Sequence, residues 1–379
     1  MGHSSKIEVE MVMFYRILVS LLFIFVYSAH ANASVEFHHA DWHITCDNTL
    51  TCYAVGYAIN NDSDAAFVSK ANLLLIRHVG EKQSIDGVIK INVDYPSGTQ
   101  VDLLINDHQC GPLTFDNYEY KLNENQVNVI INSLKSVDDV VMLVIEDQKI
   151  KLSARGFNAT MLKMDDVQGR VGTVGAIIKK GAKDESEVYP AAAIPMINRA
   201  AISNSYEAMP ITYTQLLEQF PHFPEVYMNK GAGELEECDA LDELTGNKTN
   251  NFFVDKDYLP KLFNLDDNYQ LFEALCSAST TRNQSNAYWL VNKSNGDSSN
   301  QELKLITRHG MNYNNGLINE EPCLDLGFDG DGYIPTAVLQ WDGADFVLRE
   351  KNTVSGDYSL AGGKWILPLF ISHHEEDNE

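Results

Sequence analysis

The spacing of apolar residues predicts strands over the first part of the chain. Short runs that alternate apolar and polar positions are separated by segments rich in Asn, Asp, Gly and Pro, which favour turns. These runs cover residues 53–59, 71–77, 88–93, 100–105, 140–145 and 149–153. Residues 123–134 instead place apolar side chains at helical spacing. Residues 34–181 are therefore predicted to form an antiparallel β-sandwich with one packed helix.

Residues 41–57 are predicted to form a β-hairpin closed by a disulfide. Two alternating runs flank the turn-prone triplet Asp47-Asn48-Thr49, and Cys46 and Cys52 lie just inside them. Closing so small a loop stabilises the fold by only about 2 kcal/mol. The hairpin is therefore expected to act as a local staple, with Trp42 anchored in the core, more than as a functional site.

A Gly-rich segment follows these strands. Residues 159–166 have the pattern of a short helix, and Gly169, Gly172 and Gly175 come soon after it. Their spacing matches neither the dinucleotide-binding motif nor the P-loop motif of phosphate sites. We therefore expect these glycines to mark turns or close packing before a strand, and we predict no cofactor.

Residues 182–196 combine a polar stretch with Pro and Ala, which predicts a linker between two domains. Residues 197–379 mix helical and strand patterns, so a second domain and an α+β fold class are predicted. Helices are predicted at residues 212–220, 234–244 and 269–276, and strands at residues 288–291, 302–307, 334–341, 346–350 and 364–371. The dipeptide Asp342-Gly343 favours a tight turn between two of these strands.

The composition is that of a globular and strongly acidic protein. The chain has 379 residues, 44% of them hydrophobic, which is enough for two domains with their own cores. Its formal net charge is -25, from 53 acidic and 28 basic residues. Such a charge repels nucleic acids and anionic lipids, so nucleic acid is excluded as a partner.

Residues 1–33 are predicted to be a secretory signal peptide. The apolar run at residues 17–26 is too short to span a bilayer, Arg16 precedes it, and a small-residue segment follows it. Cleavage is expected after Ala31 or Ala33, which leaves no membrane span and a periplasmic or secreted protein. The alternative is an uncleaved membrane anchor. Translation starts compatible with this leader lie at Met1, Met11 and Met13.

All six cysteines lie in the predicted mature chain, and an even number in an exported protein favours up to three disulfides. Besides the hairpin pair, we expect Cys238 to pair with Cys276. This bridge would tie two predicted helices and stabilise the fold by about 4 kcal/mol. No metal site is predicted, because no two cysteines show C-x2-C spacing and no histidine pair is suitably placed.

No catalytic residue is assigned from the sequence. The tripeptide Arg308-His309-Gly310 matches the opening of the histidine phosphatase signature, but it lies deep in a β-rich region. Asp325, Asp329 and Asp331 resemble an EF-hand calcium loop with the wrong register, which leaves only a weak calcium site of another type open. The acidic residues between Glu234 and Asp239 fit the solvated face of a helix better than a calcium site.

Four motifs together resemble one bacterial family. They are Asp-Trp…Cys-Asp-Asn-Thr…Cys from residue 41, Leu-Ser…Gly-Phe followed by Asp-x-x-Gln-Gly-Arg-x-Gly-Thr from residue 152, Asn286-Ala287-Tyr288 with the second-domain cysteines, and Trp341-Asp342-Gly343-x-x-Phe346-x-Leu348. The family is that of exported proteins known as domain of unknown function 1176, whose opening segment is similar to the invasion-associated locus B proteins. The resemblance implies a periplasmic or secreted protein of a Gram-negative bacterium and no assigned activity.

The chain departs from the pattern of this family near its end. The family has a second cysteine after the Trp-Asp-Gly strand, shortly before a Trp-Pro, whereas residues 354–365 contain no cysteine. Cys323 therefore either pairs with Cys110, as a link between the domains, or stays free.

Two functions fit these observations. The first is a non-enzymatic binding protein whose acidic surface meets a cationic protein or a cell-envelope component. The alternative is a hydrolase that uses carboxylates such as Asp41, Asp47 or the group at residues 234–239. Two carboxylates converging in a deep cleft would favour the enzyme, and an exposed flat apolar patch would favour binding. The sequence favours the binding protein.

Overall fold

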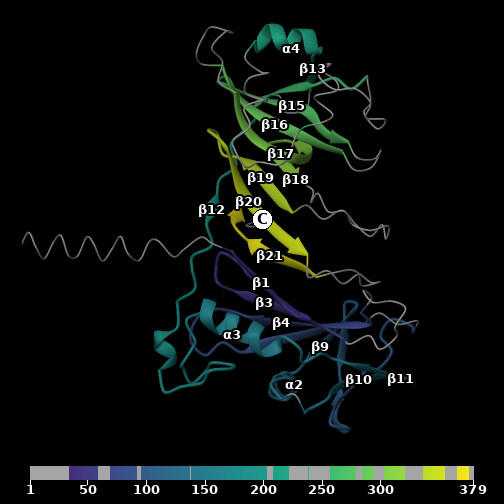
Figure 1. Cartoon of the computed structure of the whole chain (residues 1–379). Coiled ribbons are helices and arrows are strands. Elements are labelled where there is room, and N and C mark those ends of the chain that lie inside the picture. The colour runs from purple at the N-terminus through teal and green to yellow at the C-terminus, as the bar shows by residue number, and fades with distance from the viewer. Residues whose placement is uncertain are drawn as a thin grey trace, which may run out of the picture. The chain divides into compact units, whose positions relative to one another are not determined.

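The computed structural model describes residues 34–58, 69–91, 95–136, 138–202, 208–221, 238, 257–278, 284–293, 303–320, 336–354 and 365–374. These residues form mainly antiparallel strands together with three α-helices (Figure 1). The predicted α+β fold class is confirmed. The chain divides into two compact units, and each is described by itself below. Unit 1 contains residues 1–194 and 354–369, and unit 2 contains residues 195–353 and 370–379.

Two antiparallel sheets form the framework of unit 1. The larger sheet has seven strands in the order β1 (Val35–His39), β2 (Trp42–Cys46), β3 (Cys52–Tyr57), β4 (Ala71–Arg77), β5 (Ile85–Ile91), β9 (Glu119–Leu122) and β8 (Thr114–Asp116). The smaller sheet has four strands in the order β11 (Gln148–Lys151), β10 (Val141–Ile145), β6 (Asp102–Ile105) and β7 (His108–Pro112). Strands β2 and β3 form the predicted hairpin.

Two helices complete the core of unit 1, whereas only the helix at residues 123–134 was predicted to pack on the sandwich. Helix α2 (Glu124–Leu134) begins with a capping box, in which Asn123 and Gln126 each accept a backbone N–H of the other. Helix α3 (Phe157–Val167) contains the predicted short helix and packs on β1, β2 and β3. Both helices contribute to one apolar cluster with the two sheets. The residues that follow α3 therefore begin at the edge of this core.

A segment from the end of the chain covers the other face of the larger sheet in unit 1. Trp365 and Leu367, at β21 (Ile366–Phe370), pack against Val55, Tyr57 and Leu74. The Trp365 indole Nε1 donates a hydrogen bond to the Asn72 side chain. The sheet therefore has buried residues on both faces, which explains the continuous apolar run in β4.

Unit 2 is built on an antiparallel meander. Its strands neighbour one another in chain order, namely β13 (Met209–Pro210), β14 (Lys261–Asn264), β15 (Tyr269–Ala278), β16 (Gln284–Asn292), β17 (Leu303–Asn314), β18 (Leu317–Glu320), β19 (Ala337–Trp341) and β20 (Phe346–Val354). Helix α4 (Tyr213–Gln219), predicted at residues 212–220, places Leu216 in the cluster on one face. The opposite face carries a second cluster around Trp341.

The helix predicted at residues 269–276 is wrong, because these residues form most of strand β15. Leu271 belongs to the apolar cluster on one face of the sheet, whereas Phe272 and Ala274 belong to the cluster on the other face. Because both faces of this strand are buried, its apolar residues fall at positions 271, 272, 274 and 275, a spacing that also suits a short helix. Apart from Cys238, the helix predicted at residues 234–244 lies outside the described residues, as does the signal peptide predicted at residues 1–33.

No helix within the described ranges has the length and apolar character needed to cross a membrane.

Candidate functional site

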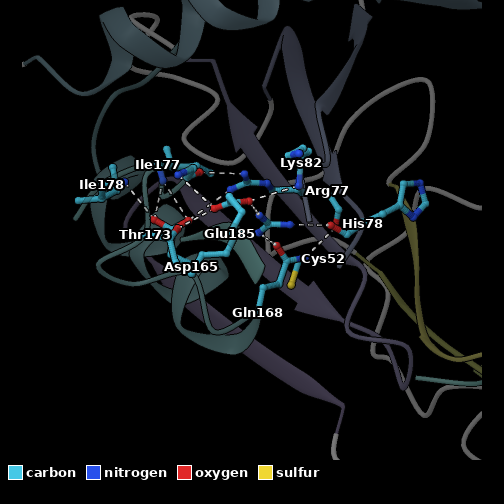
Figure 2. Close-up of polar contacts among 12 residues, drawn as sticks. Cys52, Arg77, His78, Lys82, Asp165, Gln168, Thr173, Ile177, Ile178 and Glu185 are labelled. Atoms are coloured by element: carbon cyan, nitrogen blue, oxygen red, sulfur yellow. Dashed lines mark hydrogen bonds and ion pairs between the residues drawn. The ribbon is translucent and has the colours of Figure 1, made fainter. Parts of the chain in front are cut away.

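Four buried charged residues of unit 1 form the charge network, which consists of Arg77, Asp165, Arg170 and Glu185. Their exposed fractions are 5%, 0%, 0% and 7%. Arg170 Nη1 lies 2.7 Å from Glu185 Oε2, and Arg77 Nη1 lies 3.4 Å from Asp165 Oδ1. Figure 2 shows Arg77, Asp165 and Glu185 close together between strand β4 and the segment that follows α3. Two positive and two negative charges meet here, so the network carries no net charge.

Backbone amides of the Gly-rich segment donate to the two carboxylates of the network. Asp165 Oδ2 accepts hydrogen bonds from the amides of Ile177 and Ile178, at 2.8 and 3.0 Å (Figure 2). Glu185 Oε1 accepts the Thr173 hydroxyl at 2.8 Å and the Gly175 amide at 3.1 Å. These are the donors that an anion-binding loop would offer to a phosphate. Because the protein's own carboxylates occupy them, they stabilise the fold.

Gly175 shows why this segment needs glycine. A Cβ atom at this position would lie 2.3 Å from Glu185 Oε1, so any larger residue would displace the carboxylate. Gly169 and Gly172 have φ values of +70° and +87°, which favour glycine. The predicted role of these glycines in turns and close packing is thus confirmed. The strand expected after them is absent from residues 176–182, all of which are described.

Gln168 and Arg170 attach the network to the predicted hairpin and to the residues at the end of β4. Gln168, fully buried, donates from Nε2 to the carbonyl oxygens of Leu50 and Arg77, at 3.0 and 2.8 Å. Arg170 Nη2 donates to the carbonyl oxygen of Gly80, just beyond β4. Asp165, Gln168, Arg170 and Thr173 are the defining residues of the motif Asp-x-x-Gln-Gly-Arg-x-Gly-Thr. The motif therefore links the segment after α3 to the hairpin of β2 and β3 and to the end of β4.

Burial and pairing set the protonation of the network. Burial raises the pKa of Asp165 above its ordinary value, although the Ile178 and Ile177 amides and Arg77 oppose this shift. For Glu185, burial acts in the same direction, but the Thr173 hydroxyl and Arg170 outweigh it and hold the pKa of Glu185 below its ordinary value. Burial lowers the pKa of Arg77 to about 10, so Arg77 stays charged at neutral pH.

The hairpin carboxylates are also bound within the protein. Asp47, which is fully buried, accepts the Thr49 amide at 2.8 Å and the Thr51 amide at 3.2 Å, and it also accepts the Tyr53 hydroxyl. This arrangement closes the turn between β2 and β3. Asp41 accepts the Ser153 hydroxyl. Both carboxylates therefore accept hydrogen bonds from the protein itself, as structural carboxylates do.

The two N-terminal motifs pack directly on each other. Trp42 is 1% exposed, and its Nε1 donates to the Ser153 carbonyl at 2.8 Å, which confirms its predicted place in the core. The Phe157 ring meets the Trp42 ring edge-on, with centroids 5.0 Å apart. Gly156 has φ +92°, and a Cβ there would lie 1.9 Å from the His39 carbonyl oxygen. The sequence Gly-Phe is therefore needed where α3 begins against β1 and β2.

A buried carboxylate also lies within the sheet of unit 2. Glu273, 3% exposed, accepts the Tyr288 hydroxyl at 2.7 Å and the Tyr258 hydroxyl at 3.2 Å, and it forms an ion pair with Lys261 at 2.7 Å. Burial, followed by the charge of Glu273, raises the pKa of both tyrosines above the ordinary value, so both stay neutral and donate. Because the carboxylate is paired and hydrogen-bonded, this cluster is a structural one.

The phosphatase interpretation of Arg308-His309-Gly310 is not supported. These residues lie within the long antiparallel strand β17, and the His309 amide donates to the Thr307 hydroxyl. A Cβ atom on Gly310 would lie 2.2 Å from the Tyr288 ring. The glycine is explained by this close packing, so the tripeptide needs no catalytic role.

Unit 2 also contains a cavity of about 360 Å³. Its lining residues are Arg199, Ala200, Ala201, Ile202, Asn315, Gln340, Arg349 and His374. All of them belong to unit 2, and none of them is acidic. This site was not predicted from the sequence, because its two arginines are far apart in the chain and belong to no recognisable motif.

The cysteine pairs Cys46–Cys52 and Cys238–Cys276 are both confirmed. Cys276 lies on strand β15, so the second bridge does not tie two helices as predicted. Cys110 forms no disulfide with another described cysteine, and Cys323 lies outside the described residues, so their pairing stays a prediction. The acidic residues predicted as alternatives at Glu234 to Asp239 and at Asp325, Asp329 and Asp331 also lie outside the described residues.

One family model covers most of the chain. A family model described as "Protein of unknown function (DUF1176)" matches residues 36–372. The chain belongs to this family. The DUF1176 match contains the whole charge network and every residue of the cavity except His374. No curated protein and no solved structure matches the chain. The similarity of the opening segment to invasion-associated locus B proteins stays a prediction.

Proposed function

We propose that this protein is an exported, non-enzymatic binding protein of the bacterial cell envelope, periplasmic or secreted. The observation that supports this proposal most is the state of the buried carboxylates. Asp47, Asp165, Glu185 and Glu273 are each held by hydrogen bonds or ion pairs within their own unit. General acid–base catalysis needs a carboxylate within reach of a substrate, and these carboxylates serve the fold.

Charge supports a cationic partner. The four charges of the charge network cancel, so burying them leaves the formal charge of -25 on the remainder of the chain. A surface of this charge attracts basic proteins and basic envelope components over a distance of about 8 to 10 Å at physiological salt. Export is supported by the leader pattern of residues 1–33 and by two disulfides, which persist in oxidising compartments.

An affinity capture from envelope extract tests this function. The protein is immobilised beside an unrelated acidic protein of similar isoelectric point, near 4.7. At low salt, we expect a basic partner to bind the column carrying this protein and not the control column. The partner should elute at high salt, because screening weakens surface electrostatics. Equal capture on both columns would show simple ion exchange and contradict the proposal. So would turnover of an envelope polymer by the purified protein.

A further inference from the structure

The cavity of unit 2 is assembled from five segments that lie far apart in the sequence. Residues 199–202 follow β12 (Met196–Ile197), residue 315 lies in the turn between β17 and β18, and β19, β20 and β22 (His373–His374) supply the remaining walls. Hydrogen bonds link these segments to one another. The Ala200 amide donates to the Trp341 carbonyl at 3.2 Å, and the Ser372 hydroxyl donates to the Arg349 carbonyl at 2.6 Å. These hydrogen bonds join the segments that form the walls of the cavity.

Each arginine of this cavity donates a hydrogen bond to a neutral oxygen. Arg349 Nη1 donates to Gln340 Oε1 at 3.0 Å, and Arg199 Nη2 donates to the Asn315 carbonyl at 2.7 Å. Gln340 is itself fully buried, which fixes the position of its side chain. A guanidinium has five N–H donors and stays charged when it binds an amide or a carbonyl oxygen. Arg349 forms no ion pair with any carboxylate of the described residues.

A cationic wall of this kind is unexpected in so acidic a chain. Acidic residues outnumber basic ones by 53 to 28, yet the eight lining residues include two arginines, one histidine and no acid. A guanidinium matches the geometry of carboxylates and phosphates, which it binds through two parallel hydrogen bonds. The volume of about 360 Å³ lies at the lower end of the range of about 300 to 1,000 Å³ for small-molecule sites.

We propose that this cavity binds a small organic anion through a carboxylate or phosphate group. Arg199 and Arg349 hold the oxyanion, Gln340 orients Arg349, and the side chains of Ala200 and Ile202 contact the apolar part of the ligand. This site goes beyond the proposed function, because it needs no cationic partner and involves the opposite charge. Either proposal can therefore fail while the other stands.

Isothermal titration of the purified protein tests the site with citrate, inorganic phosphate and glucose as probes. We expect at least one of the two anions to bind, with an affinity that falls as salt is raised, and glucose to give no heat. Binding of citrate alone identifies a carboxylate ligand, and binding of phosphate alone identifies a phosphate ligand. Absence of heat with both anions up to about 10 mM would overturn the proposal, since binding weaker than this is not specific recognition.

Variants locate the binding. Arg349→Gln is expected to weaken anion binding at least about tenfold, because it removes the charge and the planar fork together, and Arg349→Lys is expected to fall between it and the wild type. The matched control is Lys351→Gln, an exposed position on the same strand that removes the same charge and should change affinity by less than about twofold. Equal losses in Arg349→Gln and Lys351→Gln would overturn the site, since they would indicate a response to net charge alone. If Arg349→Gln fails to fold by thermal melting, Arg199→Gln takes its place in the comparison.

Discussion

Unit 1 and unit 2 use arginines in opposite ways. In unit 1, Arg170 is completely buried and lies 2.7 Å from Glu185, so the chain supplies its counter-charge. In unit 2, Arg349 is only half-buried, contacts the neutral amide of Gln340, and lines a cavity. A buried charge that is neutralised by its own chain stabilises the fold, whereas a charge held by neutral groups beside a cavity is available to a ligand. This difference separates structural from functional arginines here.

The first prediction compares these two arginines by the same substitution. Arg170→Gln is expected to lower the free energy of unfolding by about 3 to 5 kcal/mol, because it leaves Glu185 buried without its counter-charge. Arg349→Gln is expected to lower it by less than about 1 kcal/mol, because no carboxylate among the described residues forms an ion pair with Arg349. Urea unfolding measures both values, and hydrogen exchange at α3 assigns the first loss to unit 1.

The double variant Arg170→Gln/Glu185→Gln is the control for this prediction. It removes both charges at once, so it should recover part of the stability lost in Arg170→Gln. If the double variant is as unstable as the sum of both single variants, the two side chains do not interact. If Arg349→Gln costs as much as Arg170→Gln, the contrast between the two units is wrong.

The second prediction compares the two disulfides, one in each unit. Cys238 and Cys276 are 38 positions apart, whereas Cys46 and Cys52 are 6 apart. Loop-closure entropy therefore predicts a loss of about 4 kcal/mol for the Cys238→Ser/Cys276→Ser variant and about 2 kcal/mol for Cys46→Ser/Cys52→Ser. Scanning calorimetry of both double variants measures the difference. A larger loss for the hairpin bridge would show that its contacts, and not loop closure, determine its contribution.

The sequence predicted those features that depend on neighbouring residues. The hairpin turn around Asp47, the helix at residues 123–134 and both bridged cysteine pairs could be predicted, because their signals lie within short segments or in cysteine usage. The interactions that define the charge network could not be predicted, since Arg77 and Asp165 are 88 positions apart. Nothing in the periodicity of one segment reports which distant charge it will meet.

Two other features needed the tertiary structure. Strand β15 was predicted as a helix, because burial on both faces removes the alternation that identifies a strand. The cavity of unit 2 draws on residues between Arg199 and His374 and therefore has no local motif. The motif Asp-x-x-Gln-Gly-Arg-x-Gly-Thr, by contrast, is a local signal. Together with three other motifs it identified the family correctly, and its Asp165, Gln168, Arg170 and Thr173 side chains form hydrogen bonds within unit 1.

The third prediction concerns a single hydrogen bond of the charge network and its dependence on pH. The Thr173 hydroxyl, fully buried, donates to Glu185 Oε1 at 2.8 Å. Thr173→Val removes this donor while keeping the shape of the side chain, so it should lower stability at pH 7 by about 1.5 to 3 kcal/mol, the usual contribution of a hydrogen bond to a charged group.

The sign of the pH dependence follows from the lowered pKa of Glu185. A carboxyl group whose pKa is lower in the folded protein contributes stability above the pKa of the unfolded chain, about 4.3 for glutamate, and loses it as pH falls through the folded pKa. The difference between wild type and Thr173→Val should therefore be largest near pH 7 and shrink below about pH 4. Thr160→Val is the matched control, because the Thr160 hydroxyl is buried in α3 without a hydrogen-bond partner among the described residues. This control should change stability little and equally at both pH values, and a pH-independent loss in Thr173→Val would show that the hydroxyl does not support the charged form of Glu185.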